Sequence, residues 1–134
     1  QNCLRVARED NPDFIKVLDF GLAKVVDRTG KSAWTVGGSP GYIAPEIYRG
    51  GRTDHRVDIF SLGVVIHTLL LGRLPAQTPG EVELPPGAPV LTLAELPAPL
   101  RALIARATAD DPEQRYPTAE AMSVYLSGGM FRIT

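Results

Sequence analysis

The stretch FIKVLDFGLAK, residues 14–24, begins as an apolar strand and then places a carboxylate, Asp19, two residues before a glycine. A second apolar run, CLRV at residues 3–6, lies upstream, and the turn-forming residues 9–13 separate the two runs. This pattern predicts a β-hairpin. Asp19 then either presents a carboxylate to a ligand or simply marks the end of the second strand.

The composition is that of one globular domain or a part of one, with 134 residues and 44% hydrophobic content. The 14 Lys and Arg residues balance 15 Asp and Glu residues without runs of like charge. We therefore expect neither a nucleic-acid partner nor a membrane segment in this chain. The single cysteine, Cys3, fits a reducing compartment, so a cytoplasmic location is expected. A longer parent protein could still carry a membrane anchor elsewhere.

Residues 54–71 are apolar on nearly every face of a helix, so we expect this helix to be buried all round. Thr53 or Asp54 is expected to cap its start, and Gly72 its end. The other expected segments are an irregular stretch over 21–42, a Pro-rich loop over 73–95 and helices over 97–109 and 118–126. The predicted fold class is mainly α with a small β-hairpin.

Two further stretches follow in a fixed order, GSPGYIAPE at residues 38–46 and DIFSLGVVIHTLLLG at residues 58–72. Together with LDFGLAK, they resemble the C-terminal lobe of a eukaryotic-like Ser/Thr protein kinase. The sequences of these motifs resemble those of bacterial members more than those of animal members. The resemblance implies a partial kinase domain over residues 1–127 and a tail over 128–134. The N-terminal lobe and the start of the catalytic loop are absent from this sequence.

The resemblance implies ATP and Mg²⁺ as cofactors, with Asn2 and Asp19 as oxygen ligands of the metal. Asn2 has an alternative interpretation as a terminal residue without a role. The family's catalytic Asp would precede Gln1, and this sequence has no Gly-rich loop or nucleotide-binding Lys. We therefore expect the chain by itself to be inactive and a longer parent to transfer the ATP γ-phosphate.

The region between the two motifs resembles a kinase activation segment. Thr35 stands where many family members are phosphorylated, and Lys24 stands where a cationic partner for that phosphate is often found. Thr35 could equally be an unregulated loop residue. Ser39 occupies a position that favours protein substrates with Ser or Thr acceptors, although it could also be a simple turn residue.

Three charged residues are expected to be structural. The resemblance implies that Glu46 and Arg115 form a buried, largely bidentate ion pair, which suits the planar guanidinium. Asp58, near the start of the apolar helix, would be costly to bury without hydrogen bonds. In the family, the matching Asp binds backbone amides of the catalytic loop.

Three interpretations of the function stay open on the sequence alone. The first is the C-terminal lobe of an active Ser/Thr kinase, which the metal and acceptor-side residues Asn2, Asp19 and Ser39 favour. The second is a pseudokinase or protein-interaction module that keeps the scaffold without the chemistry. The third is a small helical protein unrelated to kinases, which is disfavoured because two short helices and a hairpin cannot cover so apolar a helix.

Overall fold

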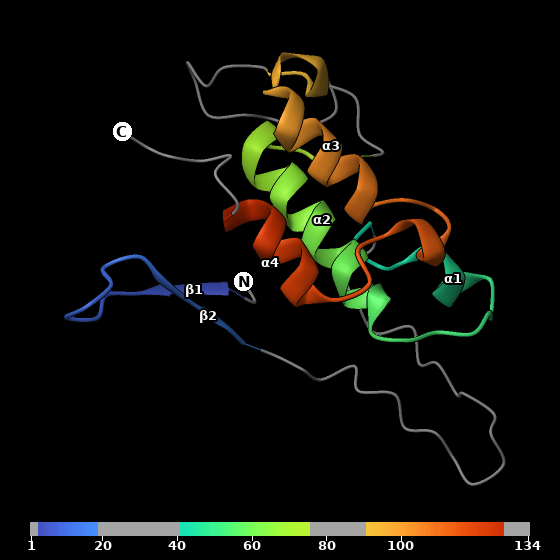
Figure 1. Cartoon of the computed structure of the whole chain (residues 1–134), viewed down its shortest axis with the longest axis horizontal. Coiled ribbons are helices and arrows are strands. Elements are labelled where there is room, and N and C mark those ends of the chain that lie inside the picture. The colour runs from blue at the N-terminus through green and yellow to red at the C-terminus, as the bar shows by residue number, and fades with distance from the viewer. Residues whose placement is uncertain (1–2, 19–40, 76–90, 128–134) are drawn as a thin grey trace, which may run out of the picture. The chain divides into compact units, whose positions relative to one another are not determined.

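The computed structural model describes residues 3–18, 41–75 and 91–127. The chain divides into two units, residues 1–38 and residues 39–134, and each is described by itself. The elements, in order, are β1 (Cys3–Val6), β2 (Phe14–Val17), α1 (Pro45–Tyr48), α2 (Arg56–Leu71), η1 (Leu93–Glu95), α3 (Ala98–Ala107), η2 (Pro112–Gln114) and α4 (Ala119–Ser127) (Figure 1). The predicted fold class, mainly α with a small hairpin, is confirmed.

The first unit contains the predicted hairpin, in which β1 and β2 pair antiparallel with Val6 opposite Phe14. Its turn is closed by two backbone hydrogen bonds between Arg8 and Asn11, with donor–acceptor distances of 3.0 and 3.3 Å. The guanidinium of Arg8 also lies 3.5 Å from the centre of the Phe14 ring. Local turn chemistry and a cation–π contact therefore support a hairpin that would be marginal as two strands alone.

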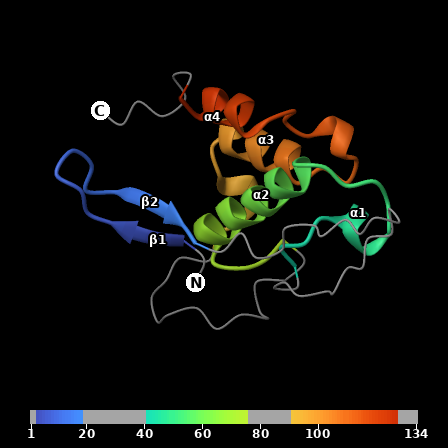
Figure 2. The same ribbon diagram turned by 90° about the horizontal axis from the view of Figure 1, so that it is seen from below.

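The second unit is built on α2, with α3 and α4 lying along one side of it (Figure 2). Side chains from all three helices and from the segments between them form one apolar cluster. Its buried members are Ile59, Leu71, Leu96, Leu103, Ile104, Ala107, Tyr116 and Met122. The α3 residues in this cluster, Leu103, Ile104 and Ala107, recur at helical spacing and so lie on one face of the helix.

The ends of α2 follow local backbone chemistry. The Asp54 carboxylate accepts a hydrogen bond of 2.8 Å from the backbone N–H of Arg56. The prediction that Thr53 or Asp54 is the N-cap residue is wrong, because His55 holds that position and makes no side-chain capping bond. The helix itself begins two residues later than predicted, at Arg56. Gly72 ends it with φ 72°, a left-handed conformation that glycine adopts without strain.

The prediction that this helix is buried all round is wrong for this chain. Leu62 and Leu69 on α2 are 41% and 79% exposed, and Asp58 is exposed as well. The reason is that α3 and α4 pack against only one side of the helix. Asp58 therefore has no burial cost to offset within this chain.

Gly63 sets how closely α2 approaches the end of α3. A Cβ atom at this position would lie 2.7 Å from the Ala107 Cβ and 2.9 Å from the Thr108 Cγ2. Both distances are shorter than van der Waals contact. The glycine in the middle of this helix is therefore required by packing rather than by backbone conformation.

Gly63→Ala is expected to destabilise the protein. Forcing a methyl group into a packed core typically costs about 1–3 kcal/mol, while alanine gains roughly 1 kcal/mol over glycine in a helix, so a net loss of about 1 kcal/mol is expected. Urea unfolding of the protein that contains this chain measures it. The control is Gly51→Ala, whose Cβ would meet the Glu46 carbonyl oxygen at an ordinary 3.6 Å. Equal unfolding midpoints for the two variants would contradict the packing argument.

The two later helices agree with the sequence to within about two residues. Pro97 precedes α3 at its N-cap position. The Thr118 hydroxyl accepts a hydrogen bond of 3.0 Å from the backbone N–H of Ala121 and so caps α4 as predicted. None of the helices in the described parts of the chain has the length and apolar character needed to cross a bilayer.

Candidate functional site

The GSPGYIAPE stretch ends in α1, a single helical turn of the helical unit. Pro45 begins this turn, where a missing N–H costs nothing. Ala44, just before it, is fully buried, and Glu46 in the first turn is 8% exposed. Glu46 is therefore a carboxylate buried within the helical unit.

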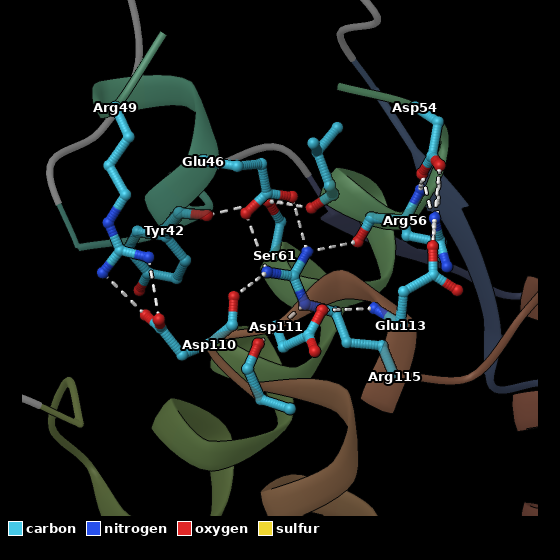
Figure 3. Close-up of polar contacts among 12 residues, drawn as sticks. Tyr42, Glu46, Arg49, Asp54, Arg56, Ser61, Asp110, Asp111, Glu113 and Arg115 are labelled. Atoms are coloured by element: carbon cyan, nitrogen blue, oxygen red, sulfur yellow. Dashed lines mark hydrogen bonds and ion pairs between the residues drawn. The ribbon is translucent and has the colours of Figure 1, made fainter. Parts of the chain in front are cut away.

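Glu46 and Arg115 form the predicted buried ion pair (Figure 3). The Arg115 Nη1 lies 2.7 Å from the Glu46 Oε1, and Nη2 lies 2.8 Å from Oε2. Arg115 is 2% exposed. Two parallel hydrogen bonds between planar groups give this pair a fixed geometry, which a lysine could not reproduce.

The other three N–H groups of Arg115 all donate to backbone carbonyls. Nε donates to Ala109 O at 2.8 Å, Nη1 to Arg56 O at 3.1 Å and Nη2 to Asp110 O at 3.2 Å. With the two bonds to Glu46, all five guanidinium donors are satisfied. One side chain therefore ties together α1, the start of α2 and the connection between α3 and α4.

The Glu46 carboxyl experiences opposing effects on its pKa. Burial raises the pKa, and the hydrogen bonds and positive charge of Arg115 lower it, with a net shift below the ordinary value. The pair is therefore ionised at neutral pH. A buried pair of this kind tolerates the loss of either partner poorly, because the other charge is left without compensation.

Arg56 forms a second ionic group next to this pair. Its Nη2 lies 2.8 Å from the Asp54 Oδ2 and 2.8 Å from the Glu113 Oε1. The side-chain hydrogen bonds from Arg56 lower the pKa of Asp54 to about 2. This group joins the start of α2 to η2. It lies next to the buried pair, because Arg115 Nη1 donates to the backbone carbonyl of Arg56.

A third ion pair, between Arg49 and Asp110, is equally well aligned but lies on the surface. Its two hydrogen bonds measure 2.7 and 2.9 Å, and its side chains are 62% and 68% exposed. Exposed pairs contribute little to stability because water screens them. It is therefore a natural comparison for the buried pair.

The structure places only some of the predicted site residues. Glu46 and Arg115 are brought together, and Asp58 lies on the exposed part of α2. The other predicted residues lie outside the described residues: Asn2, Asp19, Lys24, Thr35 and Ser39. Within residues 3–18, 41–75 and 91–127, no group of three or more His, Cys, Asp or Glu side chains could hold a metal ion. The metal assignment of Asn2 and Asp19 stays a prediction.

Sequence reasoning missed the partners of Arg56 and the carbonyl acceptors of Arg115. Arg56 and Glu113 are 57 positions apart in the sequence, and no local pattern links them. Backbone carbonyls are present at every residue, so their use as acceptors leaves no signal in the sequence.

Comparisons with known proteins agree with this architecture. The protein kinase domain family matches residues 1–125. The chain is 35% identical over 140 residues to the serine/threonine-protein kinase pkn3 of Myxococcus xanthus, an alignment that covers 94% of this chain and 26% of pkn3. It is 39% identical over 129 residues to the serine/threonine-protein kinase Pkn1 of the same organism, with coverage of 90% and 19%.

A third relative from Myxococcus xanthus, named tyrosine-protein kinase MasK, is 39% identical over 134 residues, with coverage of 85% of this chain and 20% of MasK. The chain belongs to the protein kinase family, which removes the third interpretation, an unrelated helical protein. It spans 19% to 26% of the length of these relatives.

Proposed function

We propose that this chain is the C-terminal-lobe part of a protein Ser/Thr kinase, which transfers the γ-phosphate of ATP to serine or threonine in protein substrates. The observation that carries the proposal is the buried Glu46–Arg115 pair. It fastens the end of the GSPGYIAPE stretch to the helical unit in a chain that matches the kinase domain over residues 1–125. A stretch so held provides a rigid boundary for a segment that receives a substrate.

In this proposal, Asp19 and Asn2 would hold Mg²⁺, and the bound ion would neutralise negative charge on the phosphates of ATP. The donor set fits, because a carboxylate and an amide oxygen are hard ligands. Asp19 directly follows Leu18, just after β2 ends at Val17.

We propose that the catalytic Asp and the nucleotide-binding Lys belong to a longer protein, of which this chain is one part. The chain's small share of its relatives' length supports this. The chain by itself is then inactive. A cytoplasmic location, where ATP is available, is part of the same proposal, as is the absence of a nucleic-acid partner, which the balanced charge supports.

The acceptor is tested by phosphoamino-acid analysis. The longer protein is incubated with γ-labelled ATP, Mg²⁺ and casein, and the labelled substrate is hydrolysed. We expect phosphoserine and phosphothreonine. Phosphotyrosine alone would contradict the acceptor assignment, an outcome that the name of MasK makes worth measuring. Binding of ATP without any transfer would instead favour the pseudokinase alternative.

Thr35 is proposed as a phosphorylation site, with Lys24 as a cationic partner of the phosphate. The expected result is a phosphate on Thr35 in the active longer protein, detected by mass spectrometry of its tryptic peptides. Thr29 and Ser32 are the internal comparison. Both carry a hydroxyl group in the same segment, but neither stands at the position where many family members are phosphorylated. Active enzyme with an unmodified Thr35 would contradict the assignment.

A further inference from the structure

One side chain of α2 holds the segment of residues 41–44, which leads from the Ser39-Pro40 pair to α1. The Ser61 hydroxyl donates to the Tyr42 carbonyl oxygen at 2.7 Å (Figure 3). The Val57 carbonyl, one turn earlier in the helix, lies 3.1 Å from the same hydroxyl. Since a hydroxyl has one proton, the shorter contact to Tyr42 is its principal bond.

The residues on either side of Tyr42 are fixed as well. Gly41 has φ +90°, a conformation that side-chain-bearing residues rarely adopt. A Cβ atom there would lie 2.8 Å from the Leu74 Cδ1, so the Leu74 side chain lies directly against this glycine. Ala44 is fully buried. The segment of residues 41–44 is thus held by packing at Gly41 and Ala44 and by the Ser61 hydrogen bond at Tyr42.

Resting on the proposed function, we infer that Ser61 is a positioning residue for the protein acceptor. It fixes the carbonyl of Tyr42, which follows Ser39 by three residues in the sequence. Loss of this bond would loosen the segment next to Ser39. The affinity for the protein acceptor should fall, while ATP binding should not change.

The chain offers a matched control on the same helix. Thr68 lies seven residues after Ser61, and its hydroxyl donates to the Val64 carbonyl at 2.8 Å, within α2. Ser61→Ala removes a hydroxyl that joins the helix to the segment of residues 41–44. Thr68→Val removes a hydroxyl that bonds only to the helix among the contacts of the described residues.

The test compares the steady-state kinetics of the longer protein with these substitutions. We expect Ser61→Ala to raise the KM for a peptide acceptor by roughly 2- to 10-fold, the effect of one lost hydrogen bond, with the KM for ATP unchanged. Ser61→Thr keeps the hydroxyl and should restore the peptide KM, and Thr68→Val should change neither KM. An unchanged peptide KM, or equal changes in both KM values, would overturn the inference.

A second measurement does not need activity. Hydrogen exchange of peptides that cover residues 41–44 should become faster in Ser61→Ala and stay at the wild-type rate in Ser61→Thr and Thr68→Val. If the wild-type protein transfers no phosphate, the proposed function and the acceptor role both fail, and exchange still tests the fastening itself. If Ser61→Ala does not fold, Ser61→Cys, which has a weaker donor, should still exchange faster than the wild type over residues 41–44. Wild-type exchange in the alanine or cysteine variant would show that Ser61 does not hold the segment.

Discussion

Arg115→Leu is expected to destabilise the protein by about 3–5 kcal/mol, because it leaves the Glu46 carboxylate buried without its partner. It also leaves the carbonyls of Arg56, Ala109 and Asp110 without the donors they have in the structure. Chemical unfolding of the longer protein measures the loss. Glu46→Gln should cost less, since it keeps an acceptor for one Arg115 N–H group and leaves the three carbonyl bonds intact.

Arg49→Leu is the matched control, because it removes an arginine from an equally bidentate pair on the surface. It should change the free energy of unfolding by no more than about 1 kcal/mol. The comparison separates burial from pairing geometry. If Arg115→Leu were as stable as Arg49→Leu, the buried pair would not be what fastens α1 to the helical unit.

Asp19→Asn is expected to reduce phosphoryl transfer by the longer protein by at least about 10²-fold, the usual effect of removing one group that stabilises transition-state charge. The substitution keeps the size of the side chain and removes the charge that would hold Mg²⁺. Initial rates at saturating ATP and Mg²⁺ measure the effect.

Asp13→Asn is the control for this change. Asp13 is a carboxylate of the same hairpin unit, exposed, with its Oδ1 3.4 Å from the Arg5 Nε. Its replacement should leave the rate unchanged. Unfolding curves that coincide for the two variants would show that the lower rate of Asp19→Asn does not come from a loss of stability. Equal rates in the two variants would contradict the metal assignment.

The sequence was a good guide where the signal is local. The hairpin follows from two apolar runs with turn formers between them, and the start of α4 follows from the Thr118 cap. The pairing of Glu46 with Arg115, 69 positions apart, came instead from the resemblance to kinases. No periodicity in either segment would have linked them.

The sequence was a poor guide where the answer depends on neighbours. The apolar residues of α2 predicted burial on every side, yet Leu69 is largely exposed, because periodicity reports which faces are apolar and not what covers them. The same limit applies to Ser61, whose partner is a carbonyl that any residue would supply. The proposed role of Asp19 depends on a bound ligand, which no pattern in the sequence can show.

The proposal that this chain is part of an active kinase is tested most directly by the rate of phosphoryl transfer to a protein substrate. Transfer of the γ-phosphate from ATP to casein is measured side by side for the longer wild-type protein and for its Asp19→Asn variant. We expect labelled phosphoserine and phosphothreonine with the wild type and at least about 10²-fold less with the variant. No transfer by the folded wild-type protein, or the same transfer by both proteins, would contradict it.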